Sequence, residues 1–449
     1  MKKLLGAVLA LAFVVVTSQA NAELLKNFKF GGSVELDAVS ARNAVSFAKG
    51  ATGVPTDHVG TAQTRIMLNM DWDLLDDVHS KITLDKNNRV YGAAGSENVN
   101  GVQVATLLDQ AYFKIDKVFG FVDSTFGRQF YGEAGDLIAY YGPRNSYGMT
   151  VTAIDGARFD WTGEKAYATV VMYEPTGHPG LAVSNYAGVN DVRGFIVGNK
   201  GNENIDAKVY IWNQETHGIA VAGSELKNTN LYIPGFKVKG KFGGLYGSLE
   251  AAFNFGDDRA NSGGFAGKAI LADVGMKADV ERIGTFNPWA QFGYGSGNGA
   301  AANQQHNMNF QSIATDYRPG AIYGRFDQTA TAGTRLFNGV ATTAGNGLQN
   351  RIIWGLGVKA TPSALNKLTV GAAYYDFNFQ NLGAGTAANA GNRHIGSEVD
   401  VTGEWKHSEN VSLKGTIGDF QPGGFIVNQV VGTHVSPALL SAFDVCVKF

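Results

Sequence analysis

The stretch AQTRIMLNMDWDLLDD, Ala62 to Asp77, decides the fold because its side chains alternate between two kinds of surface. Small or apolar residues stand at the even positions from Ala62 to Leu74, and polar or charged residues at the odd positions, with Met67 as the exception. A period of two is typical of a β-strand whose faces meet different environments. Whether the apolar face meets a protein core or lipid is the question that the rest of the sequence answers.

The N-terminal stretch MKKLLGAVLALAFVVVTSQANAE predicts a secretory signal peptide over residues 1–22. Lys2 and Lys3 precede an apolar run that reaches Val16, and the small residues Ala20 and Ala22 flank Asn21 in a cleavage pattern. The alternative is a membrane anchor, but the apolar run is short for a full span. No Pro/Ser linker divides the remainder of the chain, so residues 23–449 are predicted to form one domain.

Composition excludes several classes of protein. After the signal, no apolar stretch approaches the roughly 20 residues that a membrane helix needs. Cys446 is the single cysteine, which excludes an intrachain disulfide and a Cys-x-x-Cys-His haem site. With 37 basic and 39 acidic residues, the charge balance gives no support to a nucleic-acid partner. The 59 glycines suit a strand-rich, tightly turned chain.

The opening pattern recurs from end to end. Eighteen alternating segments begin near residues 28, 62, 79, 106, 121, 151, 166, 191, 205, 231, 245, 266, 285, 350, 367, 394, 411 and 438. Short connections such as 75–78, 163–165, 243–244 and 407–410 alternate with long ones at 42–61, 131–150, 174–190, 296–349 and 419–436. This arrangement is typical of an all-β transmembrane antiparallel barrel with short periplasmic turns and long extracellular loops.

A soluble β-sandwich or propeller could also alternate, but three features disfavour it. Most strands carry charges on their polar face, which a packed core would not accept unpaired. Blades and Greek keys do not require strictly alternating loop lengths. Trp72, Trp161 and Trp405 lie on the apolar face within three residues of a short turn, where a membrane-interface girdle is expected. The apolar face is therefore predicted to meet lipid, and eighteen strands would enclose an aqueous lumen.

Two motifs give a resemblance to a known family. The stretch FGRQFYGEAGD (126–136) is similar to a Gly-Arg-Gln segment, and IGSEVDVTGEWKHSENVSLKGTIGDFQPGG (395–424) to a strand–turn–strand with a closing Pro-Gly. Both are found in outer-membrane porins, most closely in the alginate-export-like group of eighteen-stranded barrels. The resemblance implies the outer membrane of a double-membraned bacterium, contact with its lipid, and recognition of the terminal Phe449 by the barrel assembly machinery.

Alternation also predicts which charges line the pore. The candidates are Arg65, Arg128, Arg158, Arg193, Lys208, Lys237, Lys239, Lys241, Asp71, Asp73, Glu398, Asp400 and Glu404. Basic side chains dominate the predicted inner face of the sixth to tenth strands. Acidic side chains dominate that of the sixteenth to eighteenth strands and of the first two, which adjoin them in a closed barrel. The two opposed walls could set up an electric field across the pore. The alternative is a set of solvated lumen charges without a tuned field. The inward placement of Arg128 depends on a bulge at Gly127.

The long loops are a second possible source of selectivity. Tyr140, Tyr141, Arg144 and Tyr147 could line a constriction if the loop 131–150 folds into the barrel mouth, and the segment 296–349 is also long enough to enter it. Aromatic faces there would suit sugar rings. The alternative, in which these loops cap the barrel outside or contact neighbours, is equally open.

These patterns lead us to expect a porin that lets small hydrophilic solutes and ions diffuse passively. A second hypothesis is a substrate-specific conduit for an acidic oligo- or polysaccharide, based on the resemblance and on Lys237, Lys239 and Lys241. A third is a barrel sheath around an electron-transfer partner. The sequence shows no catalytic motif and no close metal-ligand spacing among its eight histidines, so neither enzyme activity nor a cofactor is expected. A homo-oligomer remains open.

Overall fold

The structure is a computed structural model that describes residues 26–44, 48–49, 58–90, 107–144, 149, 151–174, 190–200, 202–219, 227–258, 263–298, 306–326, 347–382, 391–429 and 434–449. The predicted signal peptide and Tyr147 lie outside these ranges. Within them, no helix is both long enough and apolar enough to cross a membrane.

Among the described residues, four shorter strands bring the main sheet to 22 strands, and the barrel wall is formed by eighteen antiparallel strands. They are β1 (Lys26–Arg42), β3 (His58–Leu75), β4 (Val78–Val90), β5 (Leu107–Val118), β6 (Val122–Gln129), β7 (Ile154–Thr162), β8 (Ala166–Glu174), β9 (Asn190–Asn199), β10 (Ile205–Ile219), β11 (Lys227–Phe242), β12 (Leu245–Phe253), β15 (Lys268–Met276), β17 (Gly284–Gly295), β19 (Arg351–Pro362), β20 (Leu368–Phe379), β21 (His394–Lys406), β22 (Val411–Pro422) and β24 (Ala438–Lys448). Every expected strand start lies within four residues of an observed one.

Short elements decorate this wall. Strands β13 (Phe255–Asp258) and β16 (Ala278–Val280) extend β12 and β15, while β14 (Gly263–Phe265) and β18 (His306–Asn307) form a parallel pair. Strands β2 (Ala48–Lys49) and β23 (His434–Val435) make a separate two-stranded sheet. The helices are α3 (Tyr323–Phe326), the 3-10 turn η2 (Ser363–Leu365) and α4 (Gly424–Gln429).

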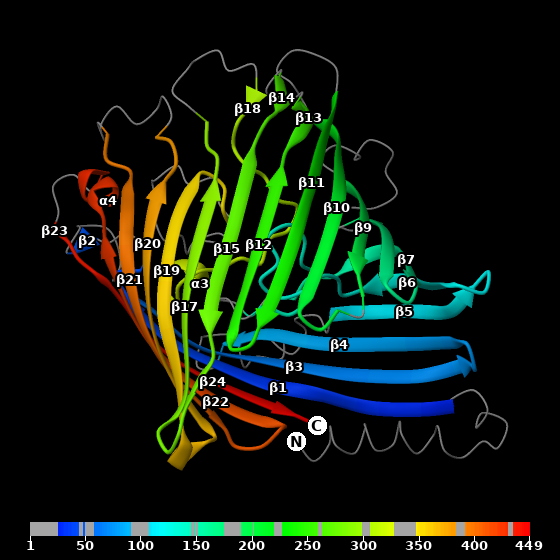
Figure 1. Cartoon of the computed structure of the whole chain (residues 1–449), viewed down its shortest axis with the longest axis horizontal. Coiled ribbons are helices and arrows are strands. Elements are labelled where there is room, and N and C mark those ends of the chain that lie inside the picture. The colour runs from blue at the N-terminus through cyan, green and yellow to red at the C-terminus, as the bar shows by residue number, and fades with distance from the viewer. Residues whose placement is uncertain are drawn as a thin grey trace.

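The sheet closes on itself because the first and last strands pair. β1 runs antiparallel to β24 from Ser33 opposite Lys448 to Arg42 opposite Leu439, so the red end of the chain lies beside the blue one (Figure 1). The terminal Phe449 prolongs the seam, since its N–H donates to the Gly32 carbonyl and its carbonyl accepts from the Gly32 N–H. Among the described residues, closure leaves the barrel wall without a free strand edge, as a spanning sheet requires.

The two faces of the wall differ as the opening stretch predicts. On β3, Ile66 and Leu74 are about 40% exposed on the outer face, whereas Arg65 is 2% exposed on the inner one. Along β21, Val399 and Val401 are half exposed outside while Glu398 and Asp400 are buried inside. The predicted all-β transmembrane barrel is therefore confirmed, with mainly apolar outward side chains along these strands.

Candidate functional site

Two chain segments fold into the lumen and bond to each other. We call residues 131–144 the first inner segment and residues 306–326 the second inner segment. The backbones of Tyr131 and Tyr141 pair with each other, and Ala139 forms a parallel bridge with Ala314. The Asp316 N–H also donates to the Asp136 carbonyl at 2.8 Å. The two segments therefore form one body inside the barrel.

The first inner segment is held by bases of the wall. Lys237 of β11 places its Nζ 2.8 Å from Asp136 and 3.3 Å from Glu250 of β12. Two residues along, Lys239 lies 2.8 Å from Glu133. Because Lys237 and Asp136 are nearly buried, their pairing is poorly screened by solvent. These lysines act as anchors of the segment, rather than as a free basic ladder.

Aromatic packing fixes the same segment to the wall. The Tyr131 ring meets Trp212 of β10 edge-on, with centroids 5.6 Å apart. The guanidinium of Arg158 on β7 lies 5.7 Å from the Tyr131 ring centroid, within cation–π range. Tyr141 packs edge-on against Tyr173 of β8 at 5.2 Å. Of the two arrangements open for this loop, the inward one is therefore observed.

The acids of the opposite wall hold the second inner segment. The N–H groups of Ile322 and Tyr323 donate to the two carboxylate oxygens of Glu398, at 2.6 and 3.0 Å. The Ala321 N–H donates to Asp400 at 2.9 Å. Glu398 is fully buried, so these donors replace the water that its carboxylate has lost.

Arg65 ties the end of the first inner segment to β3. Its guanidinium pairs with Glu35 of β1 and donates to the backbone carbonyls of Arg144, at 2.9 Å, and Met149, at 3.3 Å. Two backbone carbonyls suit a guanidinium group, which offers five donors in a fixed plane.

Five other predicted lumen residues also face inward. Lys208 and Glu404 line cavities in the lumen. Nearer the turn end, Asp71 pairs with Lys81 at 3.2 Å, and Asp73 bonds to His79. Lys241 shares the inner face of β11 with Lys237 and is exposed.

The inward placement of Arg193 is wrong. It stands opposite Asn213 on β10 and shares its strand face with Phe195, which is 48% exposed on the outer surface. The inner face of β9 instead carries the buried Val192 and Ile196. The first inner segment packs against this part of the wall, so the inner face of β9 is apolar. The polar face of β9, which carries Arg193, therefore points outward and was assigned to the lumen in error.

The bulge predicted to turn Arg128 inward is also not formed. Gly127 has a φ of 115°, but the pairing of Arg128 with Ala111 and with Asp155 continues without a register shift. Arg128 therefore shares a face with Phe126, which stacks on the exposed Phe113, and it forms an ion pair with Asp155. A positive φ at glycine was absorbed within the ladder without inserting a residue.

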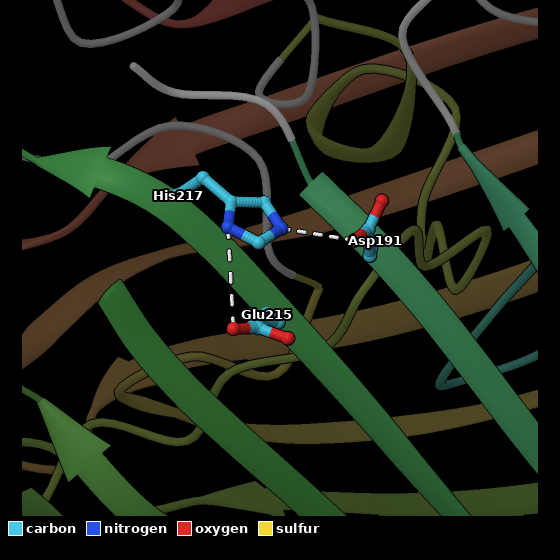
Figure 2. A group of neighbouring side chains, drawn as sticks. All are labelled: Asp191, Glu215 and His217. Atoms are coloured by element: carbon cyan, nitrogen blue, oxygen red, sulfur yellow. Dashed lines mark hydrogen bonds and ion pairs between the residues drawn. The ribbon is translucent and has the colours of Figure 1, made fainter. Parts of the chain in front are cut away.

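Figure 2 shows Asp191, Glu215 and His217 side by side. Their possible metal-ligating atoms lie within 4.8 Å of one another. They lie on the outer face, where His217 Nε2 is 2.9 Å from Asp191. Arg193 stands 3.7 Å from Asp191 and 3.5 Å from Glu215 and already supplies positive charge to both acids. We assign this cluster the role of joining β9 to β10.

Polar cavities lie in succession along the inner wall. One of about 570 Å³ and another of about 380 Å³ share Asp273, Gln291, Arg318 and Tyr375. A third, of about 210 Å³, shares Glu133 and Glu250 with the second. Adjoining cavities with shared lining residues therefore lie along the lumen beside the inner segments.

Arg318 of the second inner segment stands where the two largest of these cavities meet. Its Nε lies 3.0 Å from Asp316, and Arg144 approaches the same carboxylate at 3.9 Å. Burial, together with the neighbouring Arg144 charge, lowers the pKa of Arg318 to about 10, which still leaves it protonated at neutral pH. At the other side, the hydrogen bond from Lys239 lowers the pKa of Glu133. The junction thus carries fixed charges of both signs.

Comparison with known proteins supports the fold. No protein-family model matches the chain, and no curated protein matches it significantly. The crystal structure of Pseudomonas aeruginosa OccK9 (OpdG) is 11% identical with a TM-score of 0.56 and covers 95% of this chain and 99% of that one. Acinetobacter baumannii OccAB4 is 11% identical with a TM-score of 0.53, covering 96% and 100%. Pseudomonas aeruginosa OccK2 (OpdF), in complex with glucuronate, is 10% identical with a TM-score of 0.54, covering 95% and 97%.

At such low identity the likeness defines a class of fold. The similar structures are outer-membrane porins with eighteen-stranded barrels, and this chain has a barrel of that type. They agree with the broad porin resemblance and lend no support to the alginate-export group in particular.

Several residues of this lumen were missed from sequence. Glu133, Asp136, Asp316 and Arg318 lie in long loops, where alternation gives no information about direction. The sequence of these loops gives no other signal that these four charged residues enter the lumen. The predicted transverse field is weakened, because the acids of the first inner segment neutralise the basic wall.

Replacing Lys237 with Gln should loosen the first inner segment. The change leaves Asp136 and Glu250 without their shared cation, and breaking a buried pair costs about 3–5 kcal/mol. We expect backbone amides of residues 131–144 to exchange hydrogen at least about tenfold faster, measured by mass spectrometry on the folded barrel. Lys241→Gln is the matched control, since Lys241 pairs with no acid among the described residues. Equal exchange in both variants would contradict the anchoring role.

Proposed function

We propose that this chain forms a water-filled channel in an outer membrane, through which small hydrophilic solutes and ions diffuse passively. The observation that carries the proposal is the string of polar cavities inside a closed barrel with an apolar outer face. The eleven predicted charges that face inward would line or shape this path. The likeness to the Occ channels supports the proposal and supports transport in preference to enzyme activity.

The inner segments favour small solutes over large ones. The first and second inner segments occupy part of the lumen, and cavities of about 570 and 380 Å³ lie beside them. Such spaces suit monomeric solutes, and a folded electron-transfer partner would have to displace both segments. A polysaccharide chain of the alginate-export type would meet the same obstruction, and Lys237 and Lys239 are engaged by acids.

The remaining assignments complete the proposal. Residues 1–22 would direct export and be removed. Phe449 would be read by the barrel assembly machinery, and it lies 55% exposed at the seam beside Phe30. Outward side chains such as Val399 and Val401 would contact lipid, with self-association left open.

Planar-bilayer recording of the purified full-length barrel tests the channel. We expect discrete current steps whose size grows in proportion to salt concentration, because ions would cross a hydrated lumen without saturable sites. Liposomes containing the barrel should also swell in isosmotic monosaccharide. A folded barrel that inserts yet passes neither ions nor monosaccharide would contradict the proposed function.

Arg318 supports a second candidate, a preference for acidic monosaccharides. Its side chain lines two cavities. A guanidinium there would attract a carboxylate solute, since Arg–carboxylate pairs are strong, charge-assisted contacts. OccK2, whose fold is similar, was crystallised with glucuronate.

Substituting Arg318 with Gln separates this candidate from a general channel. Glucuronate should reduce the wild-type ion current at concentrations where glucose does not, and R318Q should weaken that block about tenfold, because a charge-assisted hydrogen bond is lost. Blocking would be measured as current reduction in single-channel recordings. If glucuronate and glucose behave alike in the wild type, the acidic preference is rejected while the general channel stands.

A further inference from the structure

Two aromatic rings lie flat against the inner wall, over a gap made by two glycines. Trp289 of β17 stands opposite Gly357 of β19, and Tyr375 of β20 stands opposite Gly355. A Cβ on Gly357 would come within 2.8 Å of an indole carbon, and one on Gly355 within 2.8 Å of the tyrosine ring. Only glycine at these positions lets both rings approach the backbone this closely.

The rings together form a continuous aromatic surface. Their centroids are 5.8 Å apart and their planes meet at 45°, so they make a shallow angled floor. Both side chains are partly exposed, and both line the cavity of about 570 Å³. That volume lies within the roughly 300–1,000 Å³ range of small-molecule pockets.

Polar side chains surround this floor, and two of them lack partners among the described residues. Asn287 precedes Trp289 on the inner face of β17, and Lys359 comes after Gly357 on that of β19. Among the described residues, neither side chain forms a hydrogen bond or an ion pair, although both line the cavity. Asp273 and Gln291 lie at its other side. An apolar solute would leave these groups without water or a substitute, which disfavours it.

We propose that Trp289 and Tyr375 form a binding platform for the ring of a pyranose sugar, a site that rests on the proposed channel function and assigns it a class of solute. A pyranose presents an apolar C–H face, which would stack on the two rings, and a rim of hydroxyls. Asn287 and Lys359 stand beside the floor, where they would bond those hydroxyls. A ring-shaped polyol therefore fits both the aromatic floor and the polar side chains beside it.

The packing of the Trp289 and Tyr375 rings on glycines also has a purely structural explanation, in which the rings fill the space beside the glycines and stiffen the wall. That role would need no free polar groups beside the floor and would not distinguish ring sugars from open-chain polyols. The two roles therefore make different predictions for binding.

Saturation-transfer NMR titration of the full-length barrel in detergent tests the platform. Methyl α-glucoside, whose ring cannot open, should bind with saturation strongest at its ring C–H protons, whereas acyclic sorbitol should show no saturable binding. Trp289→Leu should weaken binding of the glucoside about tenfold, because aromatic stacking is lost while apolar volume is kept. Trp354→Leu is the matched control, since Trp354 lies on the outer face of β19 at 55% exposure.

Tyr375→Leu provides a second variant if Trp289→Leu fails to fold, as judged by migration on a gel before and after heating. Equal binding of glucoside and sorbitol, or binding unchanged in a folded Trp289→Leu barrel, would overturn the platform. Ion conductance without sugar is recorded separately. A barrel that conducts but shows no ring preference contradicts the platform alone, and one that binds glucoside but does not conduct contradicts the channel alone.

Discussion

The whole architecture depends on pairing the first strand with the last. In hydrocarbon an unpaired backbone N–H or carbonyl has no water to bond, so β1 must close on β24 and the seam must reach Phe449 and Gly32. Closure forces every strand to present one face to lipid and one to the lumen. The alternation of apolar and polar residues, seen most clearly in the stretch 62–77, is the consequence of that single constraint.

Closure also creates a lumen that must be filled or hydrated. Here the chain fills much of it with its own loops, and the charges of the wall hold those loops in place. Lys237 and Lys239 bind acids of the first inner segment, while Glu398 and Asp400 accept backbone N–H groups of the second. The charged side chains of the wall therefore hold the two inner segments in place. Solutes would pass through the cavities that remain beside these segments.

The sequence was sufficient for the barrel, since strand number, strand starts and outer face can all be predicted from a period of two. The period of two did not predict the inner face of a strand correctly where a loop packs against that strand inside the barrel. Arg193 was placed inside because β9 has apolar residues on both faces, and the inner ones, Val192 and Ile196, are buried under the first inner segment. Contacts between a loop and a distant strand, such as that of Lys237 with Asp136, leave no pattern in the local sequence. The two glycines at positions 355 and 357 do stand out in the sequence, and they mark the place where aromatic rings pack on the wall.

The central claim is that the anchored inner segments set the bore, and single-channel conductance of a Glu398→Ala, Asp400→Ala barrel tests it most directly. Removing both acceptors should release the second inner segment and raise the conductance several-fold over the wild type in the same salt, because an eighteen-stranded barrel without its inner segments encloses a wide aqueous channel. A folded double variant with the wild-type conductance would contradict the account, since the bore would then be set by the wall alone.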